Sequence, residues 1–180
     1  ATSEGLYRTT NGGTSWTLVS PNTSYYYDLE WKPGSSTRVY ACTANTFYMS
    51  TDGGASFVNS NANMDVAIGS CTRIALTVTP ANANYVYLYA GYSDGAGGLF
   101  NKGVYRSTNS GDDFTQRTST DAITTGLPSY MHNIVAASDN VNIVLTANLD
   151  IWRSTNGATN FSLANQRGDA TQTDYAHDDV

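Results

Sequence analysis

The stretch Thr9-Thr10-Asn11-Gly12-Gly13-Thr14-Ser15-Trp16 recurs three more times along the 180-residue chain, at residues 50–57, 107–114 and 154–161. Each octet consists of a hydroxyl residue, Thr, Asn or Asp, two small residues, a variable residue, a polar residue and an aromatic. The first residues of successive copies are 41, 57 and 47 positions apart. Repetition at this period indicates an array of similar structural units, such as the blades of a propeller.

The octet has the composition of a tight hairpin turn. An Asn or Asp side chain accepts hydrogen bonds from nearby backbone amides, and the glycine two positions later tolerates a positive φ. The last copy, with Asn156-Gly157-Ala158, lacks the second glycine. Two outcomes are open there: Gly157 takes over the positive-φ role, or Ala158 carries mild strain.

Strand-like segments fill the chain between the octets. Before each octet lies an aromatic-containing strand, of which Leu6-Tyr7-Arg8 is the first example. After the first octet come the runs Tyr25–Trp31 and Arg38–Cys42, separated by the turn Lys32-Pro33-Gly34-Ser35. These runs are rich in β-branched and aromatic residues and are bounded by turn residues, as strands are. The order in each unit is therefore strand, turn, strand, loop, strand, octet turn, strand.

The octet resembles the Asp-box, or BNR repeat, with the pattern Ser-x-Asp-x-Gly-x-Thr-Trp. Asp-boxes occur on β-propellers of the sialidase, xyloglucanase and sortilin types, and in secreted Bacteroidetes-type bacterial proteins. The resemblance implies a structural role for these residues of the four copies: Thr9, Asn11, Gly13, Trp16, Ser50, Asp52, Gly54, Phe57, Ser107, Asn109, Gly111, Phe114, Ser154, Asn156 and Phe161. Because the same box is found on enzymes, receptors and assembly factors, it predicts a fold and not an activity.

We therefore predict an all-β chain of propeller blades, each a four-stranded antiparallel sheet, with about three and a half blades present. Residues 1–20 form a partial blade, and three blades follow at about 21–62, 63–120 and 121–168. Residues 169–180 begin another blade. Since propellers carry about four to eight blades, we expect a segment of a longer propeller whose remainder comes from the same or another chain. The alternative is a self-contained four-bladed ring.

Composition limits the classes of function. Charged residues make up 13% of the chain and the net charge is −6, which argues against nucleic-acid binding because that requires basic patches. No apolar stretch is long enough to span a membrane. The abundance of polar uncharged residues and tyrosine favours an extracellular or cell-surface protein. We expect a protein or glycan partner, no cofactor and no metal site.

Two other sets of residues allow more than one interpretation. Cys42 and Cys71 either form a disulfide between blades or remain buried thiols. Arg8, Arg106 and Arg153 each precede an octet. Sialidases hold a carboxylate with an arginine cluster, but an equivalent position in several blades favours a structural role, such as binding turn carbonyls.

Three segments are candidate functional sites. Tyr26, Asp28 and Glu30 lie on an aromatic and acidic strand near the expected propeller axis, where they either bind a sugar or pack between blades. Residues 92–102 form a glycine-rich insertion that lacks the ending of a phosphate loop. Asp178 belongs to a His-x-Asp-like ending, residues 174–179, that resembles blade starts of secreted bacterial Asp-box proteins.

Two functions follow as hypotheses. The first is a secreted or cell-surface propeller that acts as a binding or scaffolding module for protein or glycan partners. The second is part of a xyloglucanase-like or sialidase-like glycoside hydrolase whose catalytic carboxylates lie partly outside the chain. Because no carboxylate pair can be placed from the sequence, we favour the binding module over the enzyme.

Overall fold

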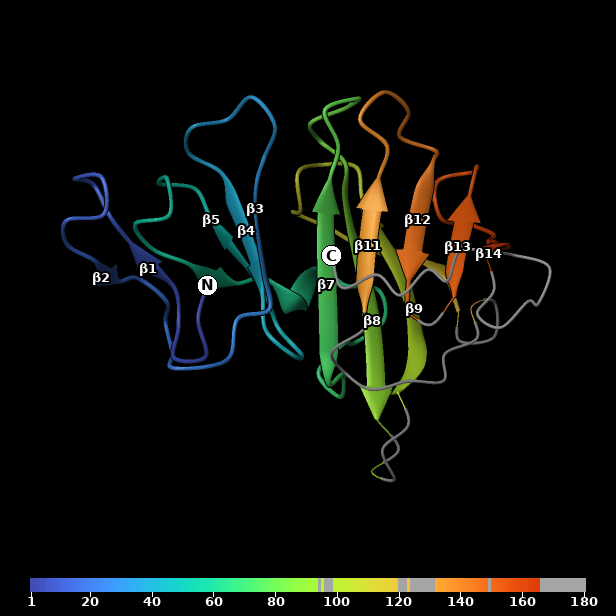
Figure 1. The fold of residues 1–180 in the computed structure, drawn as a ribbon, viewed down its shortest axis with the longest axis horizontal. Helices are drawn as coiled ribbons and strands as arrows, with labels where there is room; N and C mark the ends of the chain where they lie inside the picture. The colour runs from blue at the N-terminus through green and yellow to red at the C-terminus, as the bar shows by residue number, and fades with distance from the viewer. Residues whose placement is uncertain (94, 96–98, 120–122, 124–131, 149, 166–180) are drawn as a thin grey trace.

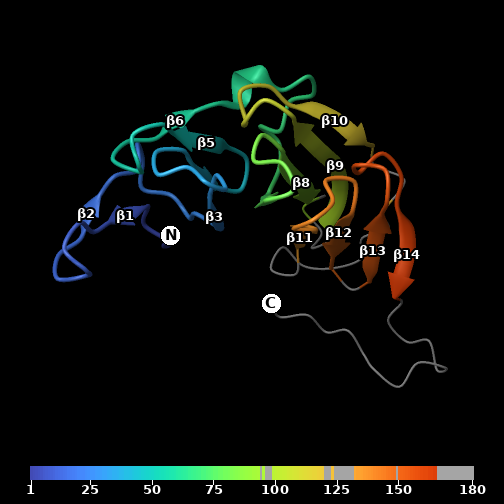
Figure 2. The ribbon, with the colours of Figure 1, turned by 90° about the horizontal axis from the view of Figure 1, so that it is seen from above.

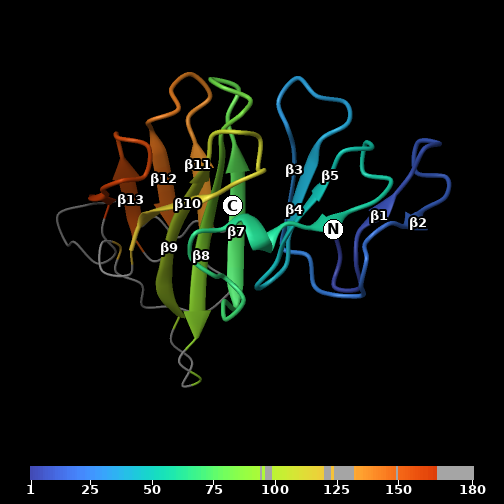
Figure 3. The same ribbon diagram turned by 180° about the vertical axis from the view of Figure 1, so that it is seen from behind.

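The chain is all-β in the computed structural model, which describes residues 1–93, 95, 99–119, 123, 132–148 and 150–165. Its strands, in chain order, are β1 Tyr7–Arg8, β2 Thr17–Leu18, β3 Asp28–Trp31, β4 Val39–Cys42, β5 Phe47–Ser50, β6 Val58–Asn59, β7 Arg73–Val78, β8 Val86–Ser93, β9 Leu99–Ser107, β10 Thr115–Thr118, β11 Asn133–Ala136, β12 Val144–Ala147, β13 Ile151–Ser154 and β14 Ser162–Asn165. One 3-10 helix, η1, covers Asn61–Asn63 between the second and third sheets (Figures 1 and 3). Within these described ranges, no helix has the length and apolar character needed to cross a membrane.

The strands form three four-stranded sheets, β3–β6, β7–β10 and β11–β14, and one two-stranded sheet, β1–β2. All neighbouring strands in them are antiparallel. Viewed from above, the sheets stand side by side in an open arc from β2 to β14 (Figure 2). The prediction of an all-β chain of four-stranded antiparallel sheets is confirmed.

The three complete sheets share one register. The first residue of each octet ends the third strand of its sheet and lies opposite a valine of the second strand. These pairs are Val39 with Ser50, Val86 with Ser107, and Val144 with Ser154. A shift by one residue would exchange the two faces of a strand. The common register therefore places equivalent residues of each sheet on equivalent faces.

Each octet turn is held by its own side chains. In the second octet the Ser50 hydroxyl donates to Asp52 Oδ1 at 2.7 Å and accepts from the Gly54 N–H at 2.9 Å. Asp52 Oδ1 also accepts from the backbone N–H groups of Ala55 and Ser56, both at 2.9 Å. The hydrogen bond from the Ser56 hydroxyl is the main cause that holds the pKa of Asp52 well below its usual range. The other three octets repeat the hydroxyl-to-Asn bond at 2.8–3.0 Å.

Both small residues of every octet adopt a positive φ. Gly53 and Gly54 have φ of 73° and 76°, and in the last octet Gly157 and Ala158 have 68° and 66°. Ala158 is therefore left-handed as well as Gly157, and of the two outcomes left open by the sequence the structure has the one in which Ala158 carries the strain. An L-residue in this conformation costs roughly 1–2 kcal/mol. Ala158 is fully buried, so its methyl group gains packing that offsets part of this cost.

Apolar side chains fill the space between neighbouring sheets. Between the second and third sheets, Tyr40 and Phe47 share a buried cluster with Ile74 and Leu76. Phe114, the aromatic of the third octet, joins this cluster through an edge-on contact with Phe47, with ring centroids 5.0 Å apart. The octet aromatic therefore fixes its own turn to the preceding blade.

The two cysteines are free, buried thiols in this same cluster. The Cys42 Sγ–H donates to the Ile74 carbonyl at 3.1 Å. Burial raises the pKa of Cys42 well above its usual range and that of Cys71 to about 11. Of the two interpretations of the sequence, the structure has the one with unpaired thiols that pack as small apolar residues.

His132 is buried between the third and fourth sheets. Its ring stacks on Tyr89 with centroids 3.7 Å apart, and Nε2 lies 3.0 Å from the Tyr89 carbonyl oxygen. A carbonyl only accepts, so Nε2 carries the proton in the neutral ring, and buried Nδ1 has no hydrogen-bond partner. Burial is the main reason that the pKa of His132 falls from 6.5 to about 3.

Replacement of Ser50 by alanine will destabilise the fold by about 1–3 kcal/mol, because the buried Gly54 N–H loses its acceptor. Urea unfolding followed by circular dichroism measures the change. Thr51→Ala, at the neighbouring exposed position, is the matched control and is expected to leave the midpoint unchanged. Equal stability of Ser50→Ala and the wild-type chain would show that the side-chain network does not hold the turn.

Acid will destabilise the chain through His132. The unfolded chain binds a proton near pH 6.5, whereas the folded chain does not until about pH 3. The stability contributed by neutral His132 is thus complete above pH 6.5 and is lost as pH falls, by about 2 kcal/mol at pH 5. Urea unfolding at pH 7 and pH 5 measures this loss.

In His132→Phe the ring stacking is kept, so we expect lower stability at pH 7 but a much smaller loss on acidification. His177→Gln, which removes the other histidine of the chain, is the control and should keep the full loss. An unchanged pH dependence in His132→Phe would contradict this assignment.

Candidate functional site

The first strands of the three complete sheets, β3, β7 and β11, are here called the inner strands. Their two ends lie at opposite rims of the arc. At the end of β3, the Lys32 ammonium donates to Ser110 Oγ of the third octet, in the following blade, at 2.6 Å. The Tyr25–Tyr27 segment precedes β3 and therefore lies at the opposite rim. The β8–β9 hairpin also points toward that rim, away from the β3–β4 and β11–β12 turns (Figure 1).

A three-layer stack, here called the tyrosine stack, occupies this opposite rim. The rings of Tyr25 and Tyr27 are stacked with centroids 4.8 Å apart and an angle of 28° between their planes. The guanidinium carbon of Arg73, the first residue of β7, lies 4.1 Å from the centroid of the Tyr27 ring. Residues two apart on an extended chain project to the same side, which brings the two tyrosines together.

The tyrosine stack leaves one aromatic face open to solvent. Tyr27 is contacted by Tyr25 and by Arg73, whereas Tyr25 is 56% exposed. Aromatic pairs contribute about 0.5–1.5 kcal/mol beyond area burial, and cation–π contacts about 0.5–2 kcal/mol. The stack is therefore an ordered surface before any ligand arrives.

Tyr26 has a different environment from its two neighbours. It is buried in the core beside Leu6 and Tyr48, and its hydroxyl donates to Asn22 Oδ1 at 2.9 Å. Burial raises the pKa of Tyr26 well above its usual range. Sequence reasoning placed Tyr26 among the ligand-binding candidates, but in the structure the exposed aromatic face belongs to Tyr25.

Asp28 links the inner strands of two blades. Its Oδ1 accepts from its neighbour Leu29 N–H, and its Oδ2 accepts from Leu76 N–H of β7, both at 2.9 Å. Desolvation raises the pKa of Asp28, and hydrogen bonds from these two amides and the charge of Arg73 oppose that rise. The carboxylate thus satisfies a backbone amide at the free edge of β7.

Glu30 lies two residues further along β3 and is half-buried. Desolvation, followed by the charge of Asp28, raises the pKa of its carboxyl group. The register aligns Glu30 with Thr77 of the next blade, whose hydroxyl accepts from Ala136 N–H at 3.4 Å. Ligand binding by Glu30 and by Asp28 stays a prediction, and Asp178 lies outside the described residues.

The glycine-rich segment extends a hairpin. The ladder between β8 and β9 continues through the pairs Gly91 with Asn101, Tyr92 with Phe100, and Ser93 with Leu99. The rings of Tyr92 and Phe100 stack with centroids 5.6 Å apart.

Arginines bind the turns of neighbouring blades instead of gathering in one place. Arg106 Nη1 donates to the carbonyl of Gly157 in the following octet at 3.4 Å. Arg38 Nη1 donates to the Ser110 carbonyl at 2.8 Å and forms an ion pair with Asp112 at 3.2 Å. Met49 occupies the arginine position of that blade, and Arg38, directly before β4, supplies the cation there.

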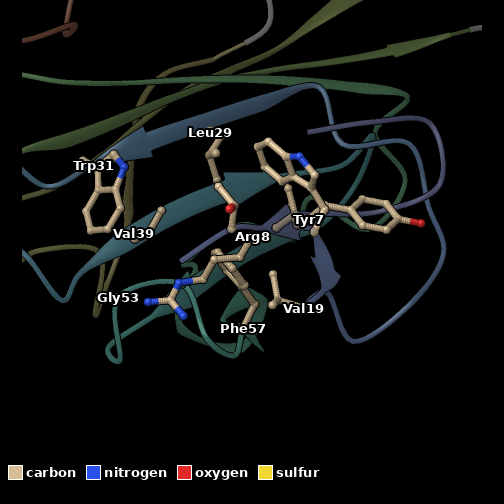
Figure 4. Close-up of a pocket in the computed structure, with 12 residues that line it drawn as sticks. Tyr7, Arg8, Val19, Leu29, Trp31, Val39, Gly53 and Phe57 are labelled. Carbon is tan, nitrogen blue, oxygen red and sulfur yellow. The ribbon is translucent and has the colours of Figure 1, made fainter. Parts of the chain in front are cut away.

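An open cavity of about 370 Å³ lies between β1 and β3 (Figure 4). Tyr7, Leu29, Trp31 and Val39 contribute apolar walls, and Arg8 approaches beside Gly53 (Figure 4). Trp16, the aromatic of the first octet, lines the cavity too. In the part of the chain that the structure describes, no three histidine, cysteine, aspartate or glutamate side chains are grouped to hold a metal ion.

The chain is similar in fold to several proteins of known structure. No protein-family model and no curated protein matches the chain. Among solved structures, an ancestral GH74 enzyme matches with a TM-score of 0.66 and 23% identity over 89% of this chain and 21% of its own. The GH74 xyloglucanase from Xanthomonas campestris matches with a TM-score of 0.61 and 13% identity over 89% of this chain and 27% of its own.

A third similar structure is that of YCF48 bound to D1 peptide. Its TM-score is 0.54, with 13% identity over 81% of this chain and 41% of its own. The chain therefore spans between about a fifth and two fifths of the length of these structures. Identities this low show the fold alone, and the fold they show is that of β-propeller blades.

Proposed function

We propose that this chain is part of a secreted or cell-surface β-propeller that binds a glycan on the tyrosine stack. The observation that carries the proposal is the open face of Tyr25, held in place by Tyr27 and Arg73. The apolar C–H face of a sugar ring stacks on such an aromatic face, and the Tyr25 hydroxyl can bind a sugar hydroxyl. The low content of charged residues, 13%, supports an extracellular setting.

The tyrosine stack is already ordered in the free protein, which favours the binding of weak ligands such as sugars. A tyrosine that is already stacked loses little side-chain freedom on binding, which lowers the entropic cost of association. The guanidinium of Arg73 covers Tyr27, so the ligand contacts Tyr25. The remainder of the propeller, from the same or another chain, would extend this rim on either side.

Tyr25→Ala will weaken binding of a soluble β-glucan about tenfold or more, which corresponds to about 1.4 kcal/mol of lost stacking. Xyloglucan is the first probe, tested by affinity electrophoresis and calorimetry on the full chain. Tyr25→Phe keeps the ring and should bind nearly as well as the wild-type chain. Tyr7→Ala, in the cavity beside β1, is the matched control and should leave binding unchanged.

Two results would contradict the glycan proposal. If Tyr7→Ala weakens binding and Tyr25→Ala does not, the ligand occupies the cavity instead. If the chain binds no polysaccharide but captures a peptide through Tyr25, the rim is a protein-binding surface.

A glycoside hydrolase is the second candidate, because Asp28 and Glu30 project from one side of β3 and both carry raised pKa values. A raised pKa suits a general acid. However, Asp28 accepts hydrogen bonds from two backbone amides, which stabilise its charged form and occupy both of its oxygens. We therefore expect binding without hydrolysis by this chain.

Incubation of the chain with xyloglucan will release no reducing ends above those of a heat-denatured sample. Glu30→Gln should bind the polysaccharide as the wild-type chain does. Release of reducing ends by the wild-type chain that Glu30→Gln abolishes would establish the enzyme instead.

A further inference from the structure

Five buried polar atoms between the third and fourth sheets have no hydrogen-bond partner among the described residues. They are His132 Nδ1, Thr146 Oγ1, Trp152 Nε1 and both amide atoms of Asn101. His132, Thr146 and Asn101 are each 3% exposed or less. Buried polar groups in folded proteins are almost always hydrogen-bonded, either to protein or to ordered water. These atoms therefore need a partner that the surrounding side chains do not supply.

Three of these side chains share one face of the fourth sheet. Thr146 lies opposite Ile134 of β11 and opposite Trp152 of β13. Ile134 belongs to the apolar cluster that joins this sheet to the third one, and Trp152 packs against that cluster. His132 precedes Ile134 by two residues, and its ring stacks on Tyr89 of the third sheet. Since residues two apart on an extended chain project to the same side, all three side chains face the third sheet.

Asn101 approaches the same space from the third sheet. The ladder between β8 and β9 pairs Tyr89 with Val104, and Gly91 with Asn101. Tyr89 and Val104 are buried against the fourth sheet. Gly91 lies two residues beyond Tyr89 on the same face of β8. Asn101 therefore projects toward the fourth sheet as well, one same-face position beyond the tyrosine on which His132 stacks.

The equivalent positions one blade earlier are largely apolar. By the common register, His132, Thr146 and Trp152 of the fourth sheet correspond to Ile74, Leu88 and Tyr105 of the third. These three counterparts are fully buried in the cluster that faces the second sheet. Ile74 and Leu88 show that hydrocarbon alone can fill these places between two blades. A histidine and a threonine there cost stability unless their polar atoms are hydrogen-bonded.

We propose that the interface between the third and fourth sheets binds internal water molecules, held by His132, Thr146, Trp152 and Asn101. Nε2 of His132 donates to the Tyr89 carbonyl, so Nδ1 accepts a hydrogen from water. The Trp152 indole N–H donates, whereas the Thr146 hydroxyl and the Asn101 amide do both. Water also donates and accepts, and a buried water molecule typically makes about three hydrogen bonds. It therefore matches this mixed set of groups.

The chemistry of the site favours water over an ion. The four side chains are uncharged at neutral pH, because burial keeps His132 neutral. An ion among uncharged, buried groups would lose its hydration without a counter-charge. The positive charge of Arg73 also acts on His132 and disfavours a cation there. The site is distinct from the exposed face of Tyr25, and the inference does not depend on glycan binding.

Magnetic relaxation dispersion of oxygen-17 water counts the long-lived internal waters of the full chain, because exchanging protein hydrogens do not contribute to it. Thr146→Val keeps the shape of the side chain and removes its hydroxyl, so we expect the loss of at least one long-lived water. Thr146→Ser keeps a hydroxyl and should retain the wild-type dispersion. Thr51→Val, at an exposed position, is the matched control and should leave the dispersion unchanged.

Urea unfolding gives an independent readout. A hydroxyl that is bonded to internal water stabilises the fold, so Thr146→Val should lower the folding equilibrium constant about fivefold. A hydroxyl without any partner would have the opposite effect, since a methyl group of the same shape removes its desolvation cost. In the wild-type chain, the Trp152 indole proton, assigned with Trp152→Phe, should show a nuclear Overhauser contact with long-lived water.

Three results would overturn the proposal. The first is a wild-type chain whose oxygen-17 dispersion shows no long-lived water. The second is the same dispersion in Thr146→Val as in the wild-type chain. The third is a higher stability of Thr146→Val, which would show that the hydroxyl is buried without a partner. If Thr146→Val does not fold, the presence or absence of the water contact at the Trp152 indole in the wild-type chain decides.

Discussion

The whole arc depends on one small hydrogen-bond network, the one formed by the hydroxyl and Asn or Asp side chains of the octet. The hydroxyl donates to the Asn or Asp oxygen and accepts backbone amides two and four residues on, as Ser107 does with Asn109 and Gly111. This network satisfies the backbone amides of a turn whose two small residues are both left-handed. It joins the third strand of a blade to the fourth through hydrogen bonds that lie within the octet.

The turn also connects one blade to the next. Left-handed backbone leaves the carbonyl of the fourth octet residue pointing outward, and a cation of the preceding blade binds it. Arg38 does this for Ser110, and Arg106 together with Arg117 does it for Gly157. Below these contacts the octet aromatic and the inner strand bury apolar surface against the same preceding blade. Hydrogen bonds to the turn carbonyls and apolar contacts below them therefore stabilise these interfaces between blades together.

The surfaces available for function are those that this repeated interface leaves open. At the rim away from the octets, the start of β3 carries the tyrosine stack, whose third layer comes from β7. Beside β1, Leu29 and Trp31 line an open, mostly apolar cavity. The tyrosine stack suits a ligand with flat apolar faces.

The sequence by itself determined the repeat, the all-β class and the four-stranded blade, because the octet is a local structure and the strands between copies follow alternation. Residues close in sequence make nearly all the bonds that hold Asp52, so its structural role was predictable. Only the tertiary structure decided which residues of Tyr25–Glu30 face solvent. Alternation separated two faces of that strand but could not tell that Arg73, 46 residues after Tyr27, covers one of them. The same holds for Asp28, since its partner amide belongs to Leu76 in the next blade, and such contacts depend on how whole sheets pack.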